Sequence, residues 1–131
     1  MKTLIVEDDL TSRIYLQELL DEYGTVHVAV NGEEAMEAVD SAADDGDPYD
    51  LICLDIMMPE VDGQEALRKI RDNEAERGIS STRGAKVVMT TALGNVSNVS
   101  EAYSNLCDAY LVKPIDKKDL IQTLRDLGLM E

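Results

Sequence analysis

Acidic, hydroxyl and ammonium side chains follow four short apolar runs of this chain, at the point where each run ends. They are Glu7, Asp8 and Asp9; Asp55; Thr90 and Thr91; and Lys113. Each alone is weak evidence, because a carboxylate in such a place is more often a helix N-cap and a single lysine is usually solvated. Their joint placement after four separate runs is the informative feature.

Carboxylates that gather in one place need positive charge nearby. If Glu7, Asp8 and Asp55 lie about 5 Å apart, each pair repels by about 3 kcal/mol at an effective dielectric constant of about 20. Lys113 supplies one positive charge, and Mg²⁺ is favoured for the rest because it combines one or two carboxylates with a phosphate oxygen and water. A carboxylate beside both could attack a phosphoryl donor, and Asp55 is best placed for this because its strand is predicted to be central.

The apolar runs alternate with amphipathic stretches along the chain. The runs have the length and β-branched content of strands, and they are residues 4–6, 26–30, 51–54, 87–89 and 110–112. The stretches between and after them have the spacing of one helical face, around residues 16–23, 35–42, 63–70, 99–106 and 120–127. This order predicts a doubly wound α/β fold, in which a five-stranded parallel sheet carries helices on both faces. Ligands bind beyond the carboxyl ends of such strands, where the polar residues collect.

Composition restricts the classes of partner. The chain has 27 acidic and 12 basic residues, so its formal net charge is −15. Such a surface repels nucleic-acid phosphates and anionic lipids, and we expect neither as a partner. No apolar run reaches the length of a membrane span or a signal peptide, which predicts a cytoplasmic protein. With 131 residues, a single domain with a substantial core is expected.

Other residues that could be reactive or bind metal have simpler interpretations. Cys53 and Cys107 belong to no metal-binding pattern, and we interpret both as small buried hydrophobic residues. His27 lies in an alternating stretch and is expected to face outward from a strand, which makes it a poor catalytic candidate. The polar residues 72–86 are interpreted as the end of the third helix followed by a mobile, solvated loop.

Four ordered motifs resemble the receiver domains of bacterial two-component signalling. They are residues 4–9 (LIVEDD), 51–59 (LICLDIMMP) with Asp62-Gly63, 87–92 (VVMTTA) and 109–114 (AYLVKP). The resemblance covers nearly the whole chain. It implies a flavodoxin-like sheet with strand order 2-1-3-4-5, and it leads us to expect a stand-alone receiver domain over residues 1–131 with no output domain.

The resemblance also implies roles for the acidic residues. Glu7, Asp8 and Asp55 would bind Mg²⁺ together with the backbone carbonyl of Met57, and Asp9 would cap the first helix. Asp55 would accept phosphate from a sensor histidine kinase or a histidine phosphotransfer protein. The expected function is therefore a phosphorylation-activated switch.

Further implied roles concern the response to phosphate. Lys113 would pair with the phosphoryl group and precede a cis peptide bond to Pro114, Thr91 would be the switch hydroxyl, and Tyr110 would rotate with it. The alternative for Tyr110 is simple strand packing. The partner surface would be the face of the fourth helix, fifth strand and fifth helix, on a monomer or a phosphorylation-dependent dimer. Apolar Met57 and Leu93 predict slow autodephosphorylation.

Two other classes of protein are weaker alternatives. Phosphatases of the haloacid dehalogenase type also use an aspartate nucleophile with Mg²⁺, but they carry a second aspartate two residues later, where this chain has Met57. A flavodoxin-like cofactor carrier would need Ser, Thr and Gly where this chain has Glu7, Asp8 and Asp9. We therefore expect a switch and not an enzyme with turnover.

Overall fold

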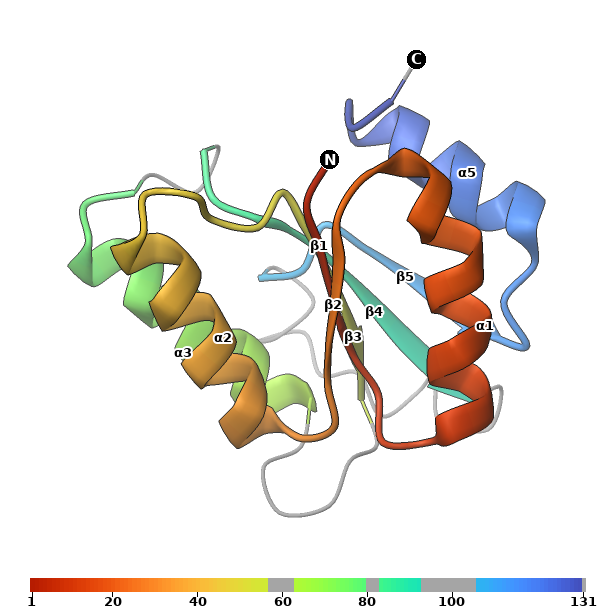
Figure 1. Ribbon diagram of the computed structural model, residues 1–131, viewed down its shortest axis with the longest axis horizontal. Coiled ribbons are helices and arrows are strands. Elements are labelled where there is room, and N and C mark those ends of the chain that lie inside the picture. Colours follow the sequence, from red (N-terminus) through yellow and green to blue (C-terminus); the bar gives the residue numbers. More distant parts are fainter. Residues whose placement is uncertain (57–62, 80–82, 93–105, 131) are drawn as a thin grey trace.

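Five parallel strands form one sheet in the order β2-β1-β3-β4-β5, with helices on both faces (Figure 1). The computed structural model describes residues 1–56, 63–79, 83–92 and 106–130. The strands are β1 (Thr3–Val6), β2 (Val26–Ala29), β3 (Leu51–Asp55), β4 (Lys86–Ala92) and β5 (Ala109–Lys113). The helices are α1 (Leu10–Leu20), the short 3₁₀ helix η1 (Asp21–Tyr23), α2 (Gly32–Asp44), α3 (Gly63–Glu76) and α5 (Lys117–Asp126). The predicted fold class and strand order are confirmed.

The sheet divides the core into two layers. Alternate side chains of β1 and β3 point to opposite faces, so Leu4 and Ile52 pack with residues of α2 and α3. Ile5 and Cys53 pack with residues of α1 and α5 on the other face. Figure 1 shows α1 and α5 on one side of the sheet and α2 and α3 on the other. Both central strands are therefore buried on two faces, which explains their continuous apolar sequence.

Three helices begin directly after a residue whose side chain caps the helix N-terminus. Asp9 accepts a hydrogen bond from the amide of Ser12 at the start of α1, which confirms the predicted cap. Asn31 accepts one from the amide of Glu34 in α2, and Asp116 accepts one from the amide of Lys118 in α5. Each cap satisfies an amide that has no partner within its helix.

Some predicted boundaries were wrong. The fourth strand continues through Thr90 and Thr91 to Ala92, so these threonines lie within β4 instead of following it. The reason is that threonine is β-branched and pairs well in a sheet, here with Thr90 opposite Asp55 of β3. Tyr23 lies in η1 and not in the first α-helix. The predicted fourth helix lies outside the described residues except for Leu106.

The remaining interpretations had mixed outcomes. His27 is exposed, as expected, and its Nδ1 lies 2.7 Å from the Tyr49 hydroxyl. Cys53 is buried, and burial raises its pKa to about 12. Cys107 is only half-buried because it lies in the chain leading to the edge strand β5. The polar stretch 72–86 begins with the end of α3, as predicted. Within that helix end, the Glu74 side chain is buried and accepts a hydrogen bond from the amide of Ala85, directly before β4.

No helix in the described parts of the chain is both long and apolar enough to cross a membrane.

The net charge of −15 predicts a fold that salt stabilises. Raising NaCl from about 0.1 M to about 1 M shortens the Debye length from about 10 Å to about 3 Å and screens repulsion between exposed carboxylates. We expect the melting temperature to rise by roughly 4 °C for each 1 kcal/mol of repulsion that is relieved. Thermal unfolding followed by circular dichroism measures this.

The control is the same titration near pH 4.2, the isoelectric point. The salt effect should be smaller there because the net charge is close to zero. A melting temperature that does not change with salt at neutral pH would contradict the prediction.

Candidate functional site

The carboxyl ends of β1, β3 and β5 bring the predicted side chains together at one edge of the sheet. Glu7 directly follows β1, Asp55 is the last residue of β3, and Lys113 is the last residue of β5. Glu7 and Asp55 are almost fully buried, with 1% and 4% of their surface exposed. Asp8, which follows Glu7, is exposed. The site is therefore a partly closed acidic pocket with one carboxylate open to solvent.

The three carboxylates are close enough to bind one metal ion. One oxygen each from Glu7, Asp8 and Asp55 lies within 4.8 Å of the other two. Ligand oxygens of an octahedral ion with bonds of about 2.1 Å lie about 3 to 4 Å apart, so a small adjustment completes such a site. The donor set consists of hard oxygens, which suits a divalent cation such as Mg²⁺. The exposed Asp8 also leaves room for water ligands.

Lys113 supplies the positive charge that the sequence led us to expect. Its Nζ lies 2.5 Å from Glu7 Oε1 and 3.5 Å from Asp55 Oδ1. β5 places Lys113 beside Glu7 and Asp55, although β5 neighbours neither β1 nor β3 in the sheet. The predicted cis peptide bond between Lys113 and Pro114 is confirmed.

These contacts alter the titration of both partners. Burial raises the pKa of Glu7, but hydrogen bonds with Asp55 and Lys113 outweigh it and leave the pKa below its ordinary value. Burial lowers the pKa of Lys113, but the hydrogen bond with Glu7 and the charge of Asp55 leave it above its ordinary value. At neutral pH the glutamate is therefore ionised and the lysine is charged. Three carboxyl groups face a single ammonium here, so the pocket suits a further cation.

Other predicted residues fall in different environments. Thr91 is fully buried in β4, and it pairs in the sheet with Val112, next to Lys113. Tyr110 of β5 is 48% exposed, and among the described residues it belongs to neither core layer. Met57, the predicted carbonyl ligand, lies outside the described residues. So does Leu93, which together with Met57 was the basis for predicting slow autodephosphorylation.

Sequence reasoning missed two side chains of α1 that support the pocket. Arg13 Nη1 donates to the backbone carbonyl of Glu7 at 3.2 Å and holds the loop after β1. The Tyr15 hydroxyl donates to the carbonyl of Ile115 at 2.7 Å and ties α1 to the chain after β5. A cavity of about 470 Å³ adjoins this contact, lined by Glu7, Thr11, Ser12, Tyr15, Leu16, Lys113, Pro114 and Ile115. The available signal was the position of both residues on the helix that follows the acidic run.

Comparison with known proteins decides the family. Residues 3–125 match the model described as the response regulator receiver domain. The chain belongs to this family. It is a receiver domain of the two-component signalling type, and the resemblance found in the sequence is confirmed.

Similar proteins include a transcriptional regulatory protein and response regulator proteins of known structure. CusR, a transcriptional regulatory protein of Escherichia coli K12, is 37% identical over 128 residues, which are 97% of this chain and 51% of CusR. A CheY-like receiver domain protein from Methanospirillum hungatei has a TM-score of 0.76 and 28% identity, with 97% of this chain and 94% of that chain covered. The response regulator TrrA from Thermotoga maritima, solved with Mg²⁺ and BeF, has a TM-score of 0.75 and 31% identity, with 96% and 97% covered. The chain spans about half the length of CusR.

The crowded carboxylates predict opposite effects of Asp8→Asn with and without metal. In EDTA the variant should have a higher melting temperature than wild type, because one of three mutually repelling charges is removed. Adding MgCl₂ at about ten times the dissociation constant should stabilise the wild type by about 1.4 kcal/mol and the variant much less. Differential scanning fluorimetry at constant ionic strength measures both.

Glu37→Gln is the matched control, since it removes an exposed carboxylate from α2, away from the pocket. It should leave the stabilisation by MgCl₂ unchanged. Equal stabilisation of wild type and Asp8→Asn would show that the ion binds elsewhere.

Proposed function

We propose that the chain is a phosphorylation-activated switch in which Asp55 accepts a phosphoryl group from a sensor histidine kinase or a histidine phosphotransfer protein. The reaction would depend on Mg²⁺ bound by Glu7, Asp8 and Asp55, with the carbonyl of Met57. The observation that carries this proposal is the placement of Asp55 within reach of both a shared ion site and the Lys113 ammonium. A nucleophilic carboxylate needs both positive groups to receive a phosphoryl group.

The chemistry of transfer follows from these residues. An oxygen of Asp55 attacks phosphorus as the bond between phosphorus and the donor's histidine nitrogen breaks, and the freed imidazole takes a proton from solvent. Mg²⁺ supplies charge neutralisation for the phosphoryl oxygens when it is bound. Lys113, 3.5 Å from Asp55, pairs with a phosphoryl oxygen of the acyl phosphate. Burial of Asp55 limits the water that reaches this bond, which supports a switch over a phosphatase with turnover.

The response to phosphate would begin at β4 and β5. Thr91 is proposed to donate its hydroxyl to the new phosphoryl group, and Tyr110 to move inward as Thr91 shifts. β4 and β5 are hydrogen-bonded neighbours in the sheet. Tyr110 lies opposite Met89, and Thr91 lies opposite Val112, two residues after Tyr110. The 48% exposure of Tyr110 supports this role, because an outward ring has room to become buried.

Two surfaces are proposed for partners. The face that includes β5 and α5 would bind the downstream protein, and exposed Tyr110 and Val112 on β5 support it. The phosphate donor has to approach Asp55 at the carboxyl edge, where α1 presents the exposed apolar side chains of Leu10, Ile14 and Tyr15. We propose α1 as its contact surface, with a monomer or a phosphorylation-dependent dimer as the functional state.

Phosphorylation of Asp55 is tested with a small phosphodonor and Mg²⁺. We expect about one phosphate per chain, stable in acid and labile in base as an acyl phosphate is, and no labelling of Asp55→Asn. Intact-mass spectrometry and release of labelled phosphate measure the stoichiometry. Many turnovers per chain would favour a phosphatase, and labelling that survives in Asp55→Asn would place the acceptor elsewhere.

The coupling between Thr91 and Tyr110 is tested with beryllofluoride and Mg²⁺ as a phosphate mimic. Solvent exposure of the Tyr110 ring should fall in wild type and should change much less in Thr91→Ala, because the hydroxyl that draws β4 toward the phosphoryl group is lost. Broadening of tyrosine NMR signals by a soluble paramagnetic probe measures exposure. Tyr23, half-buried in η1, is the internal control, and an unchanged Tyr110 in wild type would contradict the proposed switch.

A further inference from the structure

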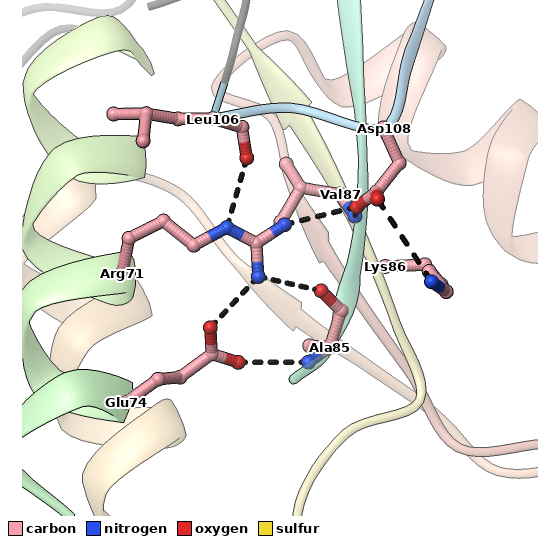
Figure 2. Close-up of polar contacts among 7 residues, drawn as sticks. All are labelled: Arg71, Glu74, Ala85, Lys86, Val87, Leu106 and Asp108. Carbon is pink, nitrogen blue, oxygen red and sulfur yellow. Dashed lines mark hydrogen bonds and ion pairs between the residues drawn. The ribbon is translucent and has the colours of Figure 1, made fainter. Parts of the chain in front are cut away.

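Arg71 of α3 joins three parts of the chain at the end of the sheet opposite the acidic pocket. Figure 2 shows its guanidinium between α3, the start of β4 and the chain that enters β5. Nε donates to the carbonyl of Leu106 at 2.8 Å, and Nη1 donates to Glu74 Oε1 and to the carbonyl of Ala85, both at 2.8 Å. Nη2 donates to Asp108 Oδ2 at 2.9 Å. Four bonds from one planar group fix these segments relative to one another.

The two carboxylates around Arg71 are themselves fully engaged. Glu74 is buried, and its Oε2 accepts the amide of Ala85 at 2.7 Å. Gly84 packs so closely on this carboxylate that a Cβ at that position would collide with it. Asp108 Oδ2 also accepts the amide of Val87 at 2.8 Å. Because Glu74 is buried and pairs with Arg71, loss of the arginine would leave its carboxylate without this cation.

Asp108 extends the pairing of β4 with β5 beyond the regular ladder. Its own amide donates to the carbonyl of Val87 at 2.8 Å, and its carboxylate accepts the Val87 amide. The two residues therefore exchange two hydrogen bonds one position before the register pair Val88 and Ala109. Arg71 holds the Asp108 carboxylate in the orientation that this exchange requires.

β5 depends on such an anchor more than the central strands do. It is an edge strand that pairs only with β4, whereas β1 and β3 have neighbours on both sides. Two of its five side chains, Tyr110 and Val112, are 48% and 38% exposed, while every residue of β1 and β3 is buried. Apolar packing therefore contributes less to holding β5, and the polar anchor at its start carries more of that task.

Lys113 lies at the other end of the same strand. It lies five positions after Asp108, or about 16 Å along an extended chain. We propose that Arg71 is a positioning residue for phosphoryl transfer: by anchoring the start of β5, it sets the place of Lys113 beside Asp55. This inference rests on the proposed function, because it requires that Lys113 assist transfer to Asp55.

The test compares Arg71→Met with Arg77→Met. Arg77 directly follows α3 and forms exposed ion pairs with Asp40 and Asp44 of α2. Its loss therefore also removes charge pairing between the end of α3 and a neighbouring element, but these ion pairs involve neither β4 nor β5. The rate constant for labelling of Asp55 by acetyl phosphate at saturating Mg²⁺ should fall at least about fivefold in Arg71→Met, since displacement by about 1 Å can cost up to about 100-fold. Arg77→Met should label like wild type.

Magnesium affinity separates positioning from general loss of structure. Glu7 and Asp8 lie in the loop after β1, and Asp55 ends β3, so none of them is on β5. The dissociation constant for Mg²⁺ should therefore stay within about twofold of wild type in Arg71→Met. Loss of a residue that orients a metal ligand costs roughly 10-fold or more. In a Lys113→Met background, Arg71→Met should slow labelling by less than about twofold, because its effect passes through Lys113. If Arg71→Met does not fold, Arg71→Lys is measured in its place and should give an intermediate rate, since one ammonium cannot reach all four acceptors.

The outcomes are distinct. Three results would each overturn the positioning role. The first is an equal labelling rate in wild type and the Arg71 variant, and the second is a loss of Mg²⁺ affinity as large as the loss of labelling rate. The third is the same fold reduction in labelling rate with and without Lys113. Labelling of wild type on Asp55 in these cases would leave the proposed function intact. Failure of wild type to label at all would overturn both.

Discussion

Repulsion among three carboxylates is the constraint on which this structure depends. Glu7, Asp8 and Asp55 offer oxygens within 4.8 Å of one another, and two of the three side chains are almost fully buried. Such a cluster destabilises a fold unless positive charge compensates it. Lys113 compensates part of the charge and leaves a deficit that suits a divalent cation. Affinity for a divalent cation is the expected consequence of this unfavourable electrostatics. A bound cation together with Lys113 would in turn favour a phosphoryl group.

The rest of the fold holds these groups against that repulsion. The acidic residues follow β1 and end β3, the two strands buried on both faces, so the most rigid part of the molecule carries them. Lys113 lies on the edge strand β5, which is less buried and is anchored at its start by Arg71 and Asp108. Apolar packing therefore holds the strands that carry the carboxylates, while polar contacts hold the start of the strand that carries Lys113. A switch needs this difference, because one side of the site has to move while the other stays.

Much of the site could be predicted because parallel sheets concentrate ligands at their carboxyl edge. The apolar runs located β1 and β3 closely, and Asp9 was recognised as a cap from its place before α1. The extent of β4 was underestimated, because an apolar criterion stops at Thr90 although threonine pairs well in a strand. The Arg71 contacts were missed because their acceptors are backbone carbonyls and carboxylates up to 37 positions away in the sequence. In addition, residues 72–86, which directly follow Arg71, have a polar composition that is typical of a solvated loop.

The sequence by itself determined the alternation of strands and helices, the parallel sheet, and the set of acidic, hydroxyl and ammonium residues at its edge. Local periodicity and turn chemistry carry that information within a few residues. Only the tertiary structure decided that Lys113 reaches Glu7 and Asp55 across β4, that Tyr110 faces solvent, and that Glu74 is buried beneath Arg71. Such facts depend on which strands neighbour one another and on how charges are paired once water is excluded, and local sequence patterns carry neither.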